Sequence, residues 1–233
     1  MRIFDIIQRF FARRSSNAVV RYYRYKGIDI GDGTYLRPKS TMIDTTRPSL
    51  VKIGKNCYMN ENFTLLTHDW VTQVFIFSGR NFLNYSGRVT IGNNVSFGHN
   101  VTILGGVTIG DNVFIGAGSI VTKDIPSNSI AVGVPCRVIS SLEDFYQKRL
   151  AVCEKEAFDY ARSIVERFHR EPNVAEFREE FPLFVSGNEV DKYPEIPIKS
   201  QLGPGYEKYL NQHRAKYSCF SDFLKAAGCK KQD

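Results

Sequence analysis

The sequence predicts a parallel β-helix, a prism of short strands wound in coils, followed by a helical region. From residue 91 an apolar residue recurs at every sixth position, and a second, mostly smaller series follows each by four positions. This period fits neither the 3.6 residues of a helical turn nor the simple alternation of a strand. The first series is Ile91, Phe97, Ile103, Ile109, Ile115 and Val121, and the second is Val95, Val101, Val107, Val113, Ser119 and Ile125.

Glycine, asparagine and aspartate recur where the chain must turn between strands. These residue types tolerate the tight backbone conformations of a corner, including positive φ. Gly92 and Gly110 are 18 residues apart, so three six-residue units form one coil of a triangular prism. Stacked coils would bury a continuous core. The predicted corners are Gly31-Asp32-Gly33, Gly54-Lys55-Asn56, Gly92-Asn93-Asn94 and Gly110-Asp111-Asn112.

Two earlier blocks carry the same period, and the breaks between blocks are informative. One break indicates a missing residue within 45–51, because Met42 and Ile53 are eleven positions apart. The other is the stretch 69–88, which has no repeat and predicts a loop excursion from the prism. Long loops on rigid scaffolds often carry function. The blocks are Ile53, Met59 and Leu65, and Ile30, Leu36 and Met42 with Thr34, Ser40 and Thr46 as their second series.

The two ends of the chain differ from the prism, which we expect to span residues 28–140. Residues 1–27 form a basic amphipathic helical segment, and residues 1–26 hold +6 of the formal net charge of +7. This segment either caps the prism, the interpretation we favour, or makes peripheral contact with an anionic membrane surface. Residues 141–233 predict a mainly helical extension, with an apolar stripe from Leu142 to Phe168 and a short helix at 220–227.

Composition restricts the class of protein further. The charge is concentrated at one end, so the body of the chain offers no basic surface for nucleic acid. No apolar run approaches the roughly 20 residues that span a membrane. The five cysteines are odd in number and lack the C-x-x-C spacing of a zinc or redox site. We therefore expect no metal and a cytoplasmic protein, at the inner face of the membrane if residues 1–26 bind there.

The segment from Val89 to Ile139 carries specific motifs, IGAGSIVTKDIP and GVPCRVI. It resembles the hexapeptide-repeat acyltransferases, a family that includes galactoside, maltose, xenobiotic and polysaccharide O-acetyltransferases, and the resemblance extends over residues 28–140. The family implies left-handed coiling, a homotrimer, and acetyl-CoA bound in a cleft between neighbouring subunits. The fold class expected is thus all-β, a left-handed parallel β-helix with an N-terminal helix and a C-terminal mainly helical extension.

The resemblance also implies a catalytic base at His68, in the sequence LLTHDW. An imidazole, with an ordinary pKa of about 6.5, can remove the proton of a hydroxyl as it attacks a thioester. In the following excursion, Asp69 and Trp70 are candidate acceptor-binding residues, with Trp70 a platform for a sugar ring. Lysine and arginine suit the phosphates of coenzyme A. The cofactor-binding positions implied by the family motifs are His99, Ala117, Thr122, Lys123 and Arg137.

The function expected is direct transfer of acetyl from acetyl-CoA to a hydroxyl of a sugar or of a polysaccharide or glycolipid precursor. An antibiotic O-acetyltransferase is the alternative within the enzymes. A non-catalytic β-helix assembly subunit is the alternative of another class, although the VTKD and GVPCRV motifs argue against it. A γ-class carbonic anhydrase needs three histidine ligands, and only His68 and His99 of the four histidines fall within the predicted prism.

Overall fold

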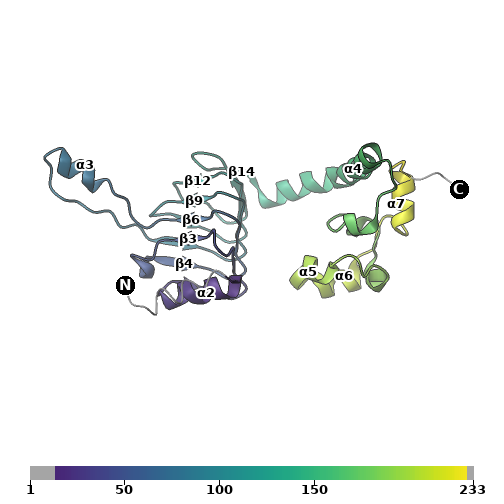
Figure 1. Ribbon diagram of the computed structural model, residues 1–233, viewed down its shortest axis with the longest axis horizontal. Coiled ribbons are helices and arrows are strands. Elements are labelled where there is room, and N and C mark those ends of the chain that lie inside the picture. Colours follow the sequence, from purple (N-terminus) through teal and green to yellow (C-terminus); the bar gives the residue numbers. More distant parts are fainter. Residues whose placement is uncertain (1–13, 230–233) are drawn as a thin grey trace. The chain divides into compact units, whose positions relative to one another are not determined.

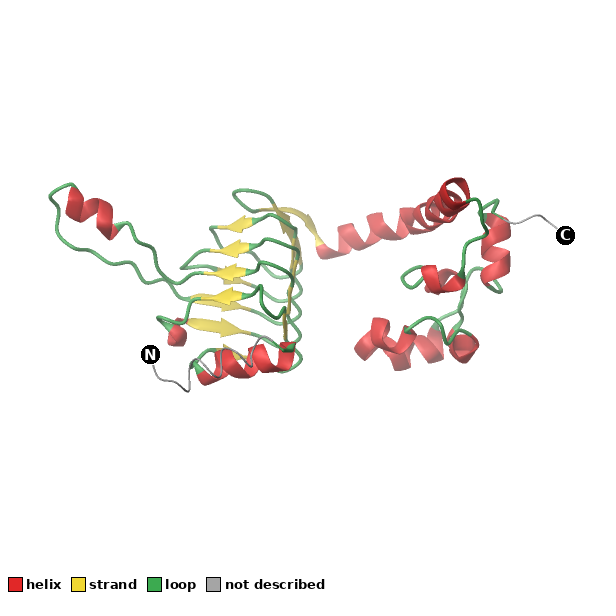
Figure 2. Cartoon of the chain, in the orientation of Figure 1, coloured by secondary structure: helices red, strands yellow, loops and turns green. Residues whose placement is uncertain are grey.

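The computed structural model describes residues 14–229, and the chain divides into two compact units, residues 1–146 and 147–233. The first unit is a stack of coils built from short strands, and the second consists of helices (Figure 1). Figure 2 shows the strands as successive layers of the stack.

Three sheets form the sides of the prism, and the chain visits sheets A, B and C in turn within each coil. All paired strands are parallel except β13 and β14, which are antiparallel. Sheet A contains β1 (Asp29–Ile30), β4 (Val51–Ile53), β7 (Val89–Ile91) and β10 (Thr108–Ile109). Sheet B contains β2 (Tyr35–Leu36), β5 (Tyr58–Met59), β8 (Ser96–Phe97), β11 (Phe114–Ile115), β13 (Ser129–Val132) and β14 (Arg137–Ser141). Sheet C contains β3 (Met42–Ile43), β6 (Thr64–Leu65), β9 (Thr102–Ile103) and β12 (Ile120–Val121).

The core of the prism consists of the two periodic series. All twelve residues from Ile91 to Ile125 in these series are at most 4% exposed. Burial of this apolar surface, about 25 cal/mol per Å² removed from water, is the main force that holds the coils together. The six-residue pattern therefore predicted the inward-facing side chains correctly over this stretch.

The corners adopt the backbone conformation that their residues predicted. Gly33 has φ of 75°, and Asn56, Asn94 and Asn112 each have φ of 55°. The asparagine side chains also bond to one another along the edge between sheets A and B. Asn94 Nδ2 donates to Asn112 Oδ1 at 3.0 Å, and Asn56 Nδ2 donates to Asn94 Oδ1 at 3.4 Å. The corner residues thus connect successive coils as well as turning the chain.

One position of the first coil was predicted wrongly. Met42 is 52% exposed, whereas Ile43 is 4% exposed and pairs with Leu65 of the next coil. The extra residue lies before β3, where Lys39 takes a positive φ of 70°, and it shifts every later residue of that turn by one. The register therefore changes at 37–41, because Leu36 and Ile43 are seven positions apart. Thr46, expected in the core, is exposed.

Helix α2 (Ser16–Tyr25) covers the open end of the prism (Figure 1). Its Val19, Val20 and Tyr23 are buried with the prism core. Polar side chains of α2 also bond to the free edges of the first coil. Arg24 donates to Ile30 O of β1, and Ser16 Oγ accepts from Leu36 N of β2. The hydroxyl of Tyr23 accepts from Ile43 N of β3 and donates to Thr41 O.

For the described part of the basic segment, the structure thus matches the capping interpretation. The segment's first thirteen residues lie outside the described residues. No helix within residues 14–229 combines the length and apolar character required to span a bilayer.

The predicted excursion leaves the prism after β6 and returns before β7 (Figure 1). It carries the short helix α3 (Thr72–Phe77), and a 3₁₀ turn, η1 (Pro48–Leu50), lies in the coil below. Several large apolar side chains of the excursion are exposed. They are Trp70, Val71, Val74, Ile76, Phe77, Phe82, Leu83 and Tyr85.

The C-terminal unit has its own core, in which Phe177, Phe184 and Phe223 are fully buried. The predicted helices are present as α4 (Leu142–Phe168) and α7 (Phe220–Ala226). The expected all-β class therefore describes the prism and not the whole chain. The remaining elements are η2 (Val174–Glu176), η3 (Phe181–Leu183), η4 (Gly187–Lys192), α5 (Ile198–Leu202), η5 (Gly203–Gly205) and α6 (Tyr206–Gln212).

The asparagine corners yield a test of the stability of the coils. We expect Asn94→Ala to lower the free energy of unfolding by about 1–2 kcal/mol, because alanine is strained at positive φ. Asn94→Gly removes the same side-chain hydrogen bonds without that strain and should lose less. Denaturant unfolding of the two variants measures the difference, and equal losses would show that φ is not the cause.

Candidate functional site

His68 is the third residue after the end of β6, at the edge of the prism between sheets C and A. Its Nδ1 is 2.6 Å from Oδ2 of Asp44, which directly follows β3 one coil below. The Asp44 side chain is 5% exposed and that of His68 is 19% exposed. The pairing of adjacent coils within sheet C brings together two residues that are 24 positions apart.

Asp44 accepts several further hydrogen bonds. Thr46 donates to Oδ1 through its backbone N at 2.9 Å and its hydroxyl at 2.7 Å. Thr67 donates to Oδ2 through its backbone N at 3.2 Å and through its hydroxyl. Burial alone would raise the pKa of Asp44, but the hydrogen bonds from Thr67, Thr46 and His68 outweigh it and hold the pKa well below its usual range. Asp44 is therefore a carboxylate at neutral pH.

The ionised carboxylate determines which nitrogen of the neutral imidazole carries the proton. A carboxylate can only accept hydrogen bonds, so His68 Nδ1 must carry the proton that lies between them. In the neutral ring the lone pair is then on Nε2, which is the arrangement of a general base. The Thr46 hydroxyl lies 3.4 Å from the same Nδ1, a longer contact than that of Asp44.

The two residues that follow His68 occupy the start of the excursion. The Trp70 ring is 71% exposed, and its centroid is 6.3 Å from that of the His68 ring. Asp69 Oδ1 accepts a hydrogen bond from Val71 N at 3.1 Å and so stabilises the local turn. Trp70 thus lies beside His68 with its surface available, whereas Asp69 is exposed and has a local partner.

The predicted cofactor-binding residues lie at two different edges of the prism. Thr122 and Lys123 follow β12 and share the sheet C–A edge with His68. His99 and Ala117 follow β8 and β11, at the edge between sheets B and C, where Gly118 N bonds to His99 O at 2.8 Å. All four are exposed. One prism therefore does not bring these two groups together around His68.

Arg137 and His99, both predicted to bind the cofactor, contact other groups of the chain. Arg137 begins β14 and donates to the carbonyl of Cys136 at 2.7 Å. His99 Nδ1 is 3.8 Å from Glu61, a surface pair with both side chains about half exposed. Among the described residues, no group of three or more His, Cys, Asp or Glu side chains is arranged to hold a metal ion.

The sequence analysis missed Asp44 and Thr67. Asp44 lay beside a recognised break in the repeat, and an aspartate directly after an inward apolar residue differs from the glycine usual at that position. Its contact with His68 could not be predicted from the spacing, because the register of β3 was misassigned by one residue at Met42.

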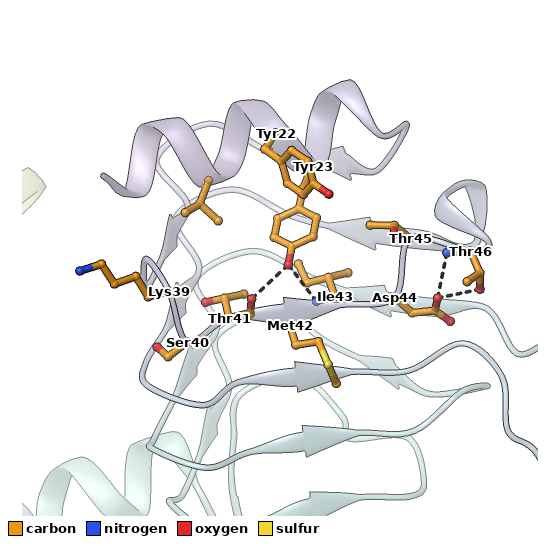
Figure 3. A pocket seen from close by; sticks show the side chains of 11 residues that line it. Tyr22, Tyr23, Lys39, Ser40, Thr41, Met42, Ile43, Asp44, Thr45 and Thr46 are labelled. Atoms are coloured by element: carbon orange, nitrogen blue, oxygen red, sulfur yellow. Dashed lines mark hydrogen bonds between the residues drawn. The ribbon is translucent and has the colours of Figure 1, made fainter. Parts of the chain in front are cut away.

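A cavity of about 480 Å³ lies between α2 and β3 and reaches Asp44 and Thr46 at one end (Figure 3). Lys39 lies at the other end of the view. The Ser40 hydroxyl is buried and makes no hydrogen bond within the described chain. The lining residues are Val19, Tyr22, Tyr23, Lys39, Ser40, Thr41, Met42, Ile43, Asp44, Thr45 and Thr46.

Comparison with known proteins identifies the repeat. Residues 88–123 match the family model described as bacterial transferase hexapeptide (six repeats). Galactoside O-acetyltransferase of Escherichia coli K12 is 44% identical over 145 residues, which cover 60% of this chain and 68% of that protein. Galactoside O-acetyltransferase of Lactococcus lactis is 31% identical over 145 residues, with the same two coverages.

A solved structure of galactoside acetyltransferase in complex with coenzyme A is 28% identical to this chain. That match covers 63% of this chain and 82% of the other, with a TM-score of 0.43. The repeat model and the two galactoside O-acetyltransferases agree with the coils described above. The chain belongs to the hexapeptide-repeat acetyltransferase family.

Proposed function

We propose that this protein transfers an acetyl group from acetyl-CoA to a hydroxyl group of a saccharide, with His68 as the general base. The observation that carries the proposal is the pair of His68 and Asp44, which leaves Nε2 as the basic atom of a partly exposed imidazole. The galactoside O-acetyltransferases among the relatives support the acceptor class. A polysaccharide or glycolipid precursor belongs to the same class.

The reaction needs one proton transfer in each direction. The acceptor oxygen attacks the thioester carbonyl while Nε2 of His68 takes the hydroxyl proton. The resulting imidazolium is stabilised by the Asp44 carboxylate through the bond at Nδ1. Collapse of the tetrahedral intermediate breaks the carbon–sulfur bond, and the imidazolium returns the proton to the departing thiolate. The products are the acetyl ester and coenzyme A, and the base is regenerated.

Coenzyme A would be held by residues from both edges. The exposed side chains of Lys123 and Arg137 suit its phosphates. The backbone at His99 and Ala117 would contact the pantetheine arm. Because Lys123 lies at a different edge of one prism from His99 and Ala117, a complete site would require a second copy. A homotrimer with left-handed coils, as in the family, would supply the facing edge.

The acceptor would bind at the sheet C–A edge, where Trp70 offers an exposed aromatic face beside His68. The cavity beneath α2 opens at Asp44 in the same region (Figure 3). Its buried Ser40 hydroxyl and its lysine suit a polar ligand with hydroxyl groups or negative charge. These features support a saccharide acceptor.

Removal of the base is the first test. We expect His68→Ala to lower kcat by about 10²–10⁴, the usual contribution of general-base assistance, while acetyl-CoA binding survives. His99→Ala is the matched control, and it should mainly alter the KM for acetyl-CoA. Near-normal kcat in His68→Ala together with an inactive His99→Ala would reverse the assignment.

Asp44→Asn tests the carboxylate. We expect kcat to fall by roughly 10²–10⁴, because an amide neither fixes the tautomer nor stabilises the imidazolium. The pKa of Asp44 is lowered in the folded state, so its ionised form adds stability that is present above about pH 4 and is lost as the pH falls further.

The stability difference between wild type and Asp44→Asn should therefore be present near neutral pH and should shrink as the pH falls below about 4. Urea unfolding at several pH values measures it. The control is Asp29→Asn, an exposed aspartate of β1 whose ion pair with Lys52 spans 4.0 Å. A pH-independent difference for Asp44→Asn would contradict the depressed pKa.

A mixing experiment tests the two-edge site. His68→Ala and Ala117→Trp damage different edges, so each should be inactive alone. Co-expressed copies in a trimer should regain activity, because about a quarter of the interfaces would join two intact edges. A mixture that assembles but stays inactive would place the whole site within one subunit, as would full activity in a monomer.

A further inference from the structure

A notch of two glycines interrupts the edge that carries His68. Gly105 and Gly106 form the corner between β9 and β10, one coil above His68, and Gly106 has φ of 83°. The corresponding corner of the next coil carries Lys123 and Asp124. At the glycine corner, the side chain of Tyr85 from the excursion occupies the space that a side chain would need.

The distances define how closely Tyr85 fits this notch. A Cβ atom built on Gly105 would lie 2.9 Å from Tyr85 Cε1, and one built on Gly106 would lie 2.7 Å from the Tyr85 hydroxyl oxygen. Both are shorter than contacts that real Cβ atoms make. The phenol ring therefore rests directly against the backbone of the corner, and glycine at 105 is what allows it.

The same notch adjoins the catalytic pair. A Cβ atom built on Gly105 would lie 3.3 Å from the carbonyl carbon of Thr67. Tyr85 and Thr67 therefore both lie next to Gly105. Two residues after Tyr85, Gly87 N donates to Thr67 O at 2.8 Å. Thr67 precedes His68 and donates to Asp44. The returning end of the excursion is thus fixed to the residue that supports the base.

Tyr85 is 41% exposed, and several other aromatic side chains of the excursion are more exposed. Trp70 is 71% exposed, Phe77 is 87% exposed and Phe82 is 65% exposed. The segment leaves the prism at Trp70 and returns at Tyr85, so both ends lie at the His68 edge. An anchor at one end restricts the conformations of the whole segment, and this lowers the entropy that is lost when a ligand orders it.

We infer that Tyr85, seated on Gly105 and Gly106, is a positioning residue for the acceptor. It holds the excursion so that Trp70 lies beside His68, where an acceptor ring on Trp70 can present a hydroxyl to Nε2. The inference rests on the proposed function. The role requires packing of the Tyr85 ring in the notch and no hydrogen bond of its hydroxyl.

Kinetics of four variants test the notch. We expect Tyr85→Ala to raise the acceptor KM about 10- to 100-fold with little change in the KM for acetyl-CoA, because a misplaced ring loses its alignment with the base. Gly105→Ala should have the same effect, since its Cβ displaces the ring. The double variant should be no worse than Tyr85→Ala alone, because both changes remove one contact. Tyr85→Phe should behave like wild type.

Trp70 is the single tryptophan of the chain, so its fluorescence reports the excursion directly. We expect lower fluorescence anisotropy of Trp70 in Tyr85→Ala and Gly105→Ala. Gly110→Ala is the matched structural control. Its Cβ would crowd Ser127 N at 2.5 Å at a distant edge, so it should lower thermal stability without changing the Trp70 anisotropy or the acceptor KM.

Three results would each overturn the inference. The double variant could show additive losses, Tyr85→Ala could leave the Trp70 anisotropy unchanged, or Tyr85→Phe could be as defective as Tyr85→Ala. The experiments distinguish failure of the inference about Tyr85 from failure of the proposed function. If His68→Ala retains activity, the proposed mechanism fails, while Trp70 anisotropy still reports whether the notch holds the excursion. If His68→Ala is inactive and Trp70 is unaffected by the notch variants, the mechanism stands and the positioning role fails.

Discussion

The structure depends on the burial of two side chains in every six residues. Each coil presents its apolar series to the axis of the prism, and no coil could bury this surface by itself. The same burial forces three changes of direction per coil, which explains the asparagines and glycines at positive φ. A side chain at a corner therefore has a position fixed by the coils above and below, and this rigidity is available to catalysis.

The pair of His68 and Asp44 lies where this regularity is interrupted. The additional residue at 37–41 moves Ile43 into the core and leaves Asp44 at the end of β3, facing His68 of the next coil. The excursion begins directly after His68, and two glycines replace corner side chains where the excursion returns. Each of these departures begins and ends on the backbone of the stacked coils.

The prism and its inward-facing residues could be predicted from the sequence because burial repeats at a fixed period, and a period is visible without a structure. The first coil was harder, since one added residue between Leu36 and Ile43 exchanged the inward and outward positions. The family resemblance indicated His68, but Asp44 escaped notice because its role depends on contact across two coils. The role of Tyr85 could not be predicted either, because its ring packs where Gly105 and Gly106 have no side chains. The C-terminal helices were predicted from their apolar stripes, and their aromatic core depends on contacts among elements far apart in sequence.

The capping of the first coil has a consequence for the length of the molecule. A stack of identical coils has no intrinsic end, and the exposed strand edges β1, β2 and β3 would be templates for another prism. Arg24, Ser16 and Tyr23 of α2 bond to backbone groups of β1, β2 and β3 respectively, and the antiparallel β14 ends sheet B at the opposite end. Side chains of one helix thus occupy strand edges on which a second prism could otherwise stack. A chain of this kind could gain or lose whole coils during evolution and remain a discrete particle, provided that these terminal elements were kept.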